Sequence, residues 1–272
     1  MVRRGRPKIF ASGAAYEWLA APAYIYDMTK PEGKYLYCVI QGKVSKNHFG
    51  IEGLEGNTTH VVNQGNLSCL VSDTSCDHYP LWREHVIAHQ KPIEEAMKHY
   101  DVLPFSFSNI ANNEDQIKKI LKERRTEFEE LLQKFKGKTE VGLKAFWPNM
   151  PLIFQEIANN PEFQRLKKIP SRVTYHQKIA AGELVEKLLE KRKQDEARDI
   201  NKAVSDLAED SKEQPLIGEN MILNAVFLIK KGSEDEFSRK VEGLAQSFPN
   251  TKIRCSGPFP LYNFISLEIK LG

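Results

Sequence analysis

Short runs of β-branched and aromatic residues alternate with amphipathic helical stripes along most of this chain. The run KYLYCVI (residues 34–40) and the almost continuous apolar run NMILNAVFLIKK (220–231) are typical of β-strands. Between such runs, apolar residues recur every three or four positions, which is the period of a helix with one buried face. This mixture predicts an α+β fold, with mixed or mostly antiparallel sheets backed by helices.

The alternation is long enough for two domains. The chain has 272 residues, and a domain usually holds about 100–200 residues. We expect an N-terminal extension over residues 1–33, an N-terminal α+β domain over 34–137 and a C-terminal α+β domain over 138–272. The strand–helix–strand order after residue 220 predicts that the C-terminal domain is ferredoxin-like, with the helical region 150–212 as an insertion or extension.

The expected elements follow from the local patterns. Asn113 with Gln116, and Ser233 with Glu236, have the spacing of a capping box at the start of a helix. The helices are predicted over residues 81–100, 113–137, 151–168, 170–212 and 233–248. The strands are predicted over 34–40, 47–54, 59–65, 66–74, 101–110, 140–147, 220–231, 251–260 and 262–270.

The charge distribution argues against a nucleic-acid partner. The net charge of +3 comes largely from the basic residues of the first eight positions, and the rest of the chain lacks the basic stripe that phosphate binding requires. Residues 4–7 spell RGRP, the core of a minor-groove AT-hook. A solvated basic tail is the competing interpretation, and DNA binding through this arm stays open as an alternative.

Cysteine usage and hydropathy predict an intracellular protein. The chain has four cysteines, without a C-x-x-C pair, which is too sparse for a disulfide scaffold. No apolar run approaches the roughly 20 residues that span a bilayer, so no lipid membrane is expected as a partner. Residues 1–27 are compatible with an upstream extension, with Met28 as the natural start.

The best candidate for a metal site is the group Cys76, His78, His85 and His89. His85 and His89 are four residues apart on a predicted helix, so both could face one metal ion. In the catalytic form of this spacing a glutamate follows the first histidine, and here that residue is Val86. His89 also lies on the apolar stripe, as a hydrogen-bonded core histidine would. We therefore predict neither a metal nor a cofactor, and no enzyme activity.

Two segments combine prolines with aromatic residues, VLPFSFSN (102–109) and GPFPLYNF (257–264). Proline removes a hydrogen-bond donor from a strand and so favours sheet edges or bulges, and aromatic residues near an edge are suited to binding a partner. The alternative is that these aromatics close the sheets and pack on helices. The candidate partner-binding residues are Phe105, Phe107, Phe259, Tyr262 and Phe264.

The same segments carry a family resemblance. Over roughly residues 34–270 the chain resembles the gas vesicle GvpF/GvpL proteins. KYLYCVI is similar to the opening strand of that family, and AHQKPIEEAMKHYDVLPFSFSNI (88–110) to its histidine-led helix followed by a VLPxxF strand. EVGLKAFW (140–147) resembles its E-W-G-V-K-type strand, and GPFPLYNF resembles its closing G-P-W-P-P-Y-x-F motif.

The sequence departs from the family pattern at a few positions. Ser106 and Ser108 stand where members often have arginine and glycine, and Val141 stands at the tryptophan of the third motif. Phe259 replaces the tryptophan of the closing motif, and Leu261 its second proline. These departures put arginine-dependent contacts in doubt and leave the fold expectation intact.

The resemblance implies a role in building gas vesicles, which are intracellular gas-filled protein shells that provide buoyancy. It implies a cytoplasmic or vesicle-bound accessory or minor structural protein, without enzyme activity, that binds the shell protein or other gas vesicle proteins. The alternative function is a small-ligand-binding regulatory protein with paired ferredoxin-like domains. A clustered polar pocket between the sheets would favour that alternative, and a flat apolar edge would favour assembly.

Overall fold

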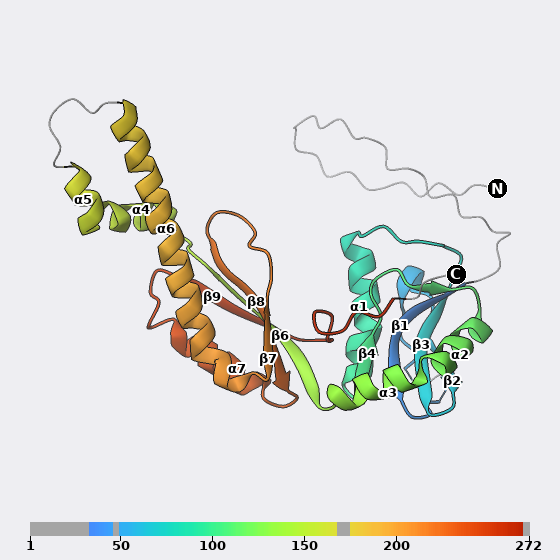
Figure 1. Cartoon of the computed structure of the whole chain (residues 1–272). Coiled ribbons are helices and arrows are strands. Elements are labelled where there is room, and N and C mark those ends of the chain that lie inside the picture. The colour runs from blue at the N-terminus through green and yellow to red at the C-terminus, as the bar shows by residue number, and fades with distance from the viewer. Residues whose placement is uncertain (1–32, 46–48, 168–174, 269–272) are drawn as a thin grey trace, which may run out of the picture.

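The computed structural model describes residues 33–45, 49–167 and 175–268. Within them the chain forms two antiparallel sheets that lie side by side, with a helical projection on the second (Figure 1). The chain passes from the first sheet to the second at Gly137. We call the parts before and after it the N-terminal and the C-terminal unit. The RGRP arm and the rest of residues 1–32 lie outside the described residues.

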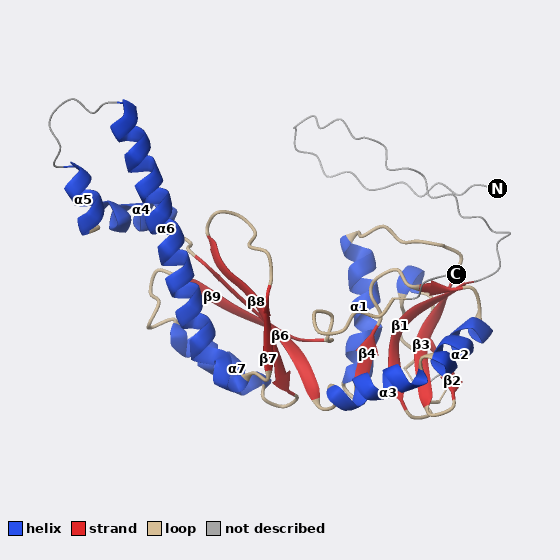
Figure 2. Cartoon of the chain, viewed as in Figure 1, coloured by secondary structure: helices blue, strands red, loops and turns tan. Residues whose placement is uncertain are grey.

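The sheet of the N-terminal unit has the strand order β2-β3-β1-β4, and β5 also pairs with β1. Helices cover both of its faces (Figure 2). Its strands are β1 (Gly33–Gln41), β2 (His60–Gln64), β3 (Leu67–Thr74), β4 (Val102–Pro104) and β5 (Ile110–Ala111). Its helices are α1 (Arg83–Met97), α2 (Glu114–Glu123), α3 (Arg125–Lys134) and the short 3-10 helix η1 (Leu54–Gly56).

The central strand β1 is buried on both faces, which explains its nearly continuous apolar sequence. A register irregularity against β3 lies between Leu36 and Cys38. Leu36 and Val39 therefore face one side, toward α2 and α3. Tyr35, Cys38 and Ile40 face the other side, toward α1.

The sheet of the C-terminal unit has the order β7-β8-β6-β9, and all its pairings are antiparallel. Helices pack on one face, where Leu143, Phe227 and Phe237 belong to one apolar cluster. The strands are β6 (Lys138–Phe146), β7 (Asp210–Glu213), β8 (Met221–Lys230) and β9 (Lys252–Phe259). The helices are α4 (Met150–Ala158), α5 (Pro161–Lys167), α6 (Tyr175–Val204), α7 (Glu234–Leu244) and the 3-10 helix η2 (Ser205–Leu207).

The structure confirms the α+β class with antiparallel sheets backed by helices. The C-terminal unit runs strand, helices, strand, strand, helix, strand, which is the element order of a ferredoxin-like unit. That order is compatible with the ferredoxin-like assignment, which stays a prediction, as do the domain boundaries at 34–137 and 138–272.

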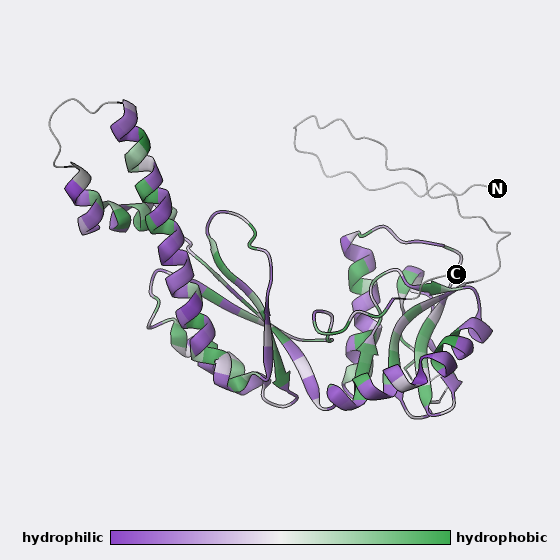
Figure 3. Cartoon of the chain, in the orientation of Figure 1, coloured by the Kyte–Doolittle hydropathy of each residue, from purple (hydrophilic) through white to green (hydrophobic). Residues whose placement is uncertain are grey.

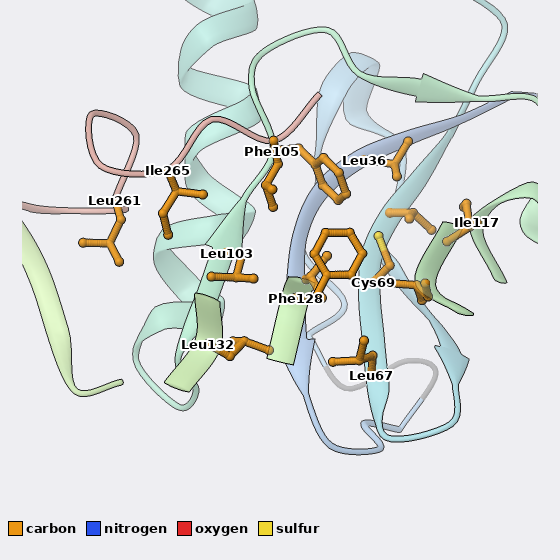
Figure 4. Close-up of a cluster of buried hydrophobic side chains, with 14 of the residues drawn as sticks. Leu36, Leu67, Cys69, Leu103, Phe105, Ile117, Phe128, Leu132, Leu261 and Ile265 are labelled. Atoms are coloured by element: carbon orange, nitrogen blue, oxygen red, sulfur yellow. The ribbon is translucent and has the colours of Figure 1, made fainter. Parts of the chain in front are cut away.

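Residues 260–268, which we call the tail, follow β9 and return to the N-terminal unit. Leu261, Ile265 and Leu267 are buried in the cluster formed by β1, β3, α2 and α3 (Figure 4). Leu267 forms a parallel bridge with Phe105, and the Ser106 N–H donates to the Leu267 carbonyl over 3.0 Å. The tail thus packs with the first unit, although the sequence places it in the second domain.

Several element predictions were wrong. The segment 262–268 is a turn with one bridge, not the predicted closing strand, and 47–54 forms no strand in its described part. The predicted helix 113–137 divides into α2 and α3 at Arg124. Strand β7 was missed because all four of its residues are exposed and it lacks the alternation that marks a half-buried strand. Pro92 lies inside an uninterrupted α1.

Within the described residues, no helix combines the length and the apolarity needed to cross a bilayer.

Candidate partner-binding site

The two proline- and aromatic-containing segments meet in space, beside the histidine of α1. The ring centroid of His89 lies 5.7 Å from that of Phe107 and 5.9 Å from that of Tyr262. The sequence predicted three separate features: the histidine-led helix, the VLPF strand and the closing motif. The fold brings all three together in one aromatic cluster. We call this the joint.

His89 is held in the joint as a neutral side chain. Its Nδ1 lies 3.0 Å from the Tyr35 hydroxyl, which also accepts the Ser108 N–H over 2.9 Å. Only 3% of His89 is exposed, and this burial lowers its pKa from 6.5 to about 4, against a smaller opposing contribution from the Phe105 backbone. Its Nε2 and the Tyr262 hydroxyl are both buried, and neither has a hydrogen-bond partner among the described residues.

Three polar residues hold the tail in place at the joint. The buried Glu140 carboxylate of β6 accepts the Asn263 backbone N–H over 3.0 Å and the Asn263 side-chain amide over 2.5 Å. The Lys212 ammonium donates to the Asn263 carbonyl over 2.7 Å and lies 5.2 Å from the centroid of the Phe264 ring. Burial raises the pKa of Glu140, and the hydrogen bonds from Asn263 partly offset that rise.

The sequence analysis missed Glu140, Asn263 and Lys212. Glu140 offered a signal, because it is a carboxylate inside the apolar strand run EVGLKAFW, and a buried carboxylate needs hydrogen-bond donors. Lys212 and Asn263 offered none, since each looks like an ordinary exposed polar residue until the fold brings β7 and the tail together.

The five predicted partner-binding aromatics fall into two groups. Phe105 is fully buried in the core of the N-terminal unit, so it cannot contact a partner in this structure. Its position in the VLP run explains this burial, because the tail covers the strand at that point. The other four, Phe107, Phe259, Tyr262 and Phe264, are half-buried.

Both segments lie at sheet edges, but only one edge is open. Strand β4 is the last strand of its sheet, and the tail pairs with the residue that follows it. Strand β9 is the last strand of the other sheet and pairs with β6 on one side, while no described strand pairs with its other side. Most of its residues are exposed, including Lys252, Arg254 and Ser256.

The metal-site candidates do not converge. His89 Nδ1 faces Tyr35, whereas His85 Nδ1 lies 3.0 Å from the Pro80 carbonyl and its ring stacks on Trp82. Among the described residues, no group of three histidine, cysteine or acidic side chains could hold a metal ion.

The geometry between the two units does not favour the ligand-binding alternative. A cavity lined by Val102, Phe135, Lys231 and Leu261 lies at their junction, with a volume of about 10 Å³. That is room for roughly one water molecule. Three larger hollows lie along α6, away from the joint.

Comparison with known proteins identifies the family. The family model described as "Gas vesicle synthesis protein GvpL/GvpF" matches residues 33–266. The chain belongs to this family.

Relatives and solved structures agree with this GvpL/GvpF assignment. The chain is 30% identical over 208 residues to gas vesicle protein F of Streptomyces sp. (strain CB03234), a match covering 75% of this chain and 87% of the relative. It is 26% identical to gas vesicle protein F of Microcystis aeruginosa (strain PCC 7806), a match covering 86% of this chain and 98% of the relative.

Two crystal structures of GvpF share the fold. The structure from Anabaena sp. PCC7120 has a TM-score of 0.75 at 24% identity and covers 89% of this chain and 99% of that chain. The structure from Microcystis aeruginosa has a TM-score of 0.72 at 26% identity and covers 86% of this chain and 99% of that chain. The joint and residues 260–266 of the tail of this GvpL/GvpF member lie within the segment that the family model matches.

Proposed function

We propose that this GvpL/GvpF protein acts in the cytoplasm during gas vesicle assembly, as a non-catalytic protein that binds the shell protein or other gas vesicle proteins. The observation that carries the proposal is the family match over residues 33–266. The names of the relatives support it, since each is a gas vesicle protein.

The open edge of β9 supports a binding mode by strand addition. An edge strand presents unpaired backbone N–H and C=O groups to which an extended partner segment can pair. The residues from Lys252 to Ser256 offer this edge, while Pro258 after them lacks a donor and limits how far a partner strand extends. The half-buried Phe259 closes the strand and adds apolar area for side chains of the partner.

Co-purification with the shell protein tests the binding. Phe259→Ala is expected to weaken shell-protein binding several-fold, because an aromatic side chain at an interface often contributes much of the binding energy. Ile87→Ala, which removes an exposed isoleucine from α1 in the N-terminal unit, is the control and is expected to bind normally. Equal binding by the Phe259→Ala protein, with its fold intact by circular dichroism, would show that the edge of β9 is not the contact.

Association with the vesicle itself is tested by immunoblotting floated vesicles before and after a denaturant wash. A signal that survives the wash indicates an embedded structural component, and a signal that is lost indicates a peripheral factor. The proposed function would be contradicted if the protein gave no signal on vesicles and also bound no gas vesicle protein.

A further inference from the structure

The helices α4, α5 and α6, which we call the helical arm, extend beyond the sheet of the C-terminal unit (Figure 1). Helix α6 has 30 residues, and its buried residues are Ile200 and Val204, close to its C-terminal end. A helix of this length is stabilised mainly by packing of its apolar face. The N-terminal half of α6 has only α4 and α5 as described helical neighbours, and so leaves part of that face uncovered.

A groove runs between α4 and this half of α6. Its volume is about 630 Å³, and its apolar lining consists of Met150, Phe154, Val185 and Leu189. Along α6 it extends from Gly182 to Lys193, which is about 17 Å at 1.5 Å per residue. That length matches roughly three turns of a second helix.

Large apolar side chains beside the groove are exposed. Phe154 of α4 is 45% exposed, and Ile179, one turn before Gly182 on α6, is 42% exposed. Figure 3 shows hydrophobic residues on both α4 and α6 where the two helices approach each other. A monomer rarely exposes neighbouring large apolar residues unless they serve as a contact surface.

Most of the charged residues that line the groove are acidic. Four glutamates and two lysines line it. Three of these glutamates, Glu183 and Glu186 of α6 and Glu219 of the β7–β8 loop, form no ion pair with a described residue. Elsewhere on α6 the acids are paired, since Glu196 binds Arg192 at 2.8 Å and Asp195 binds Arg198 at 2.7 Å.

We propose that this groove binds an amphipathic helix of a protein partner, with an apolar stripe flanked by lysine or arginine on both sides. The apolar floor fits the stripe, and glutamates contributed by α6 and by the β7–β8 loop complement basic flanks. The acid excess disfavours nucleic acid. The site is distinct from the β9 edge, so each proposal can fail alone.

A fluorescein-labelled synthetic helix provides the probe. We would use a peptide of about 14 residues, four turns at 3.6 residues per turn, with leucines at i, i+3, i+4 and i+7 and lysines on both flanks. A twin peptide carries glutamate in place of each lysine. Fluorescence anisotropy at about 0.15 M salt is expected to give at least tenfold tighter binding for the lysine peptide.

Two variants locate the binding. Phe154→Ser is expected to weaken binding of the lysine peptide about tenfold, whereas Ile87→Ser, which changes a residue of similar exposure (41%) on α1, leaves it unchanged. The triple change Glu183→Lys, Glu186→Lys and Glu219→Lys is expected to reverse the preference toward the glutamate peptide. The matched control, Glu130→Lys, Glu236→Lys and Glu242→Lys, keeps the original preference.

Three results would overturn the proposal. The first is equal binding of both peptides, or of neither, by the unmodified protein. The second is an equal effect of Phe154→Ser and Ile87→Ser in proteins that circular dichroism shows to be folded. The third is a dimer in sedimentation equilibrium that Phe154→Ser dissociates, because the groove would then be occupied by a second copy of this chain.

Discussion

At the scale of single residues, Glu140 and His89 are ionisable groups that the fold buries on either side of the tail. Burial shifts their pKa values in opposite directions, raising that of Glu140 and lowering that of His89 to about 4. Each shift reflects a cost of carrying charge inside the protein. The neutral His89 therefore makes the stability of the joint depend on pH. The buried Glu140 makes it depend on the hydrogen bonds from Asn263.

We predict that stability falls as the pH drops from about 6.5 to 4 because of His89. The unfolded chain takes up the proton near pH 6.5, while the folded protein resists protonation down to about 4. Stability from this residue is therefore complete above pH 6.5, and roughly 3 kcal/mol is lost across the window. Urea unfolding at pH 7.5 and 5 measures the part of this loss that falls above pH 5, which is about 2 kcal/mol.

His89→Gln is the control for that pH dependence. Glutamine does not titrate and keeps an amide near Tyr35, so the variant is expected to lose much less stability between the two pH values. The contribution of Glu140 is the same in both proteins and cancels in the comparison. An unchanged pH dependence in His89→Gln would show that another group is responsible.

We also predict that Asn263→Ala lowers the free energy of unfolding by about 2 kcal/mol, because it leaves the buried Glu140 carboxylate short of a donor. In a Glu140→Gln background the same change is expected to cost less, since no charge is left unsatisfied. Urea midpoints of the four proteins form the double-mutant cycle. Additive losses would mean that the two residues do not act together.

The residue patterns could predict part of this site. The aromatic segments were visible in the sequence, and His89 was considered both as a metal ligand and as a core histidine. That the two segments meet was not visible, because Tyr262 and His89 are brought together only by the return of the tail. Burial of Phe105 was missed for the same reason.

At the scale of elements, capping distinguishes two helices that looked alike in sequence. The Asn113 side chain accepts the Gln116 N–H over 2.9 Å, and the Gln116 side chain accepts the Asn112 N–H over 2.7 Å. The predicted box at Ser233 does not form through its side chain. Instead Glu234 accepts the Gly232 N–H over 2.7 Å.

We therefore predict that Asn113→Ala destabilises the protein by about 1 kcal/mol, the usual value of an N-cap. Asn113→Asp retains an acceptor and is expected to stay near the wild-type value. Ser233→Ala is expected to change stability by only a few tenths of a kcal/mol, because the serine makes no cap bond. Thermal melts rank the three, and a reversed order would contradict the capping assignment.

The elements with the strongest apolar periods in the sequence were the ones predicted most accurately. Strands such as β1 and β8 and helix α7 were predicted within a few residues because their apolar periods are strong. Strand β7 has no apolar period and forms because its backbone pairs with β8. The segment 262–268 has the composition of a strand. Its side chains pack into the core instead, and its backbone forms a turn in which the Ile265 N–H donates to the Leu261 carbonyl.

At the scale of the whole molecule, the tail connects the two units. It leaves the edge of the second sheet and fills the core of the first, and Leu228 of β8 joins the same apolar cluster. Lys231 adds a polar link, with its ammonium 2.7 Å from the Asp101 carboxylate. The contribution of the tail and of Leu228 to the first core could not be predicted from the sequence, because it depends on contacts far apart in the chain.

We predict that Leu267→Ala costs about 2–5 kcal/mol, the range for a fully buried leucine. Because the tail contacts both units, we also expect calorimetry to show one thermal transition for the wild type and a broadened or split transition for the variant. Leu216→Ala, at a position 49% exposed, is the control and is expected to have little effect. Unchanged melting of Leu267→Ala would mean that the tail adds nothing to the first core.

The bridge between Phe105 and Leu267 also has a consequence for synthesis. The two residues are about 160 positions apart, and translation at about 5–20 residues per second separates their appearance by roughly 10 to 30 s. During that interval the nascent first unit has an incomplete core and an unpaired position beside β4. It is then most exposed to aggregation or to capture by another chain, so slow translation of the second half is a hazard specific to this topology.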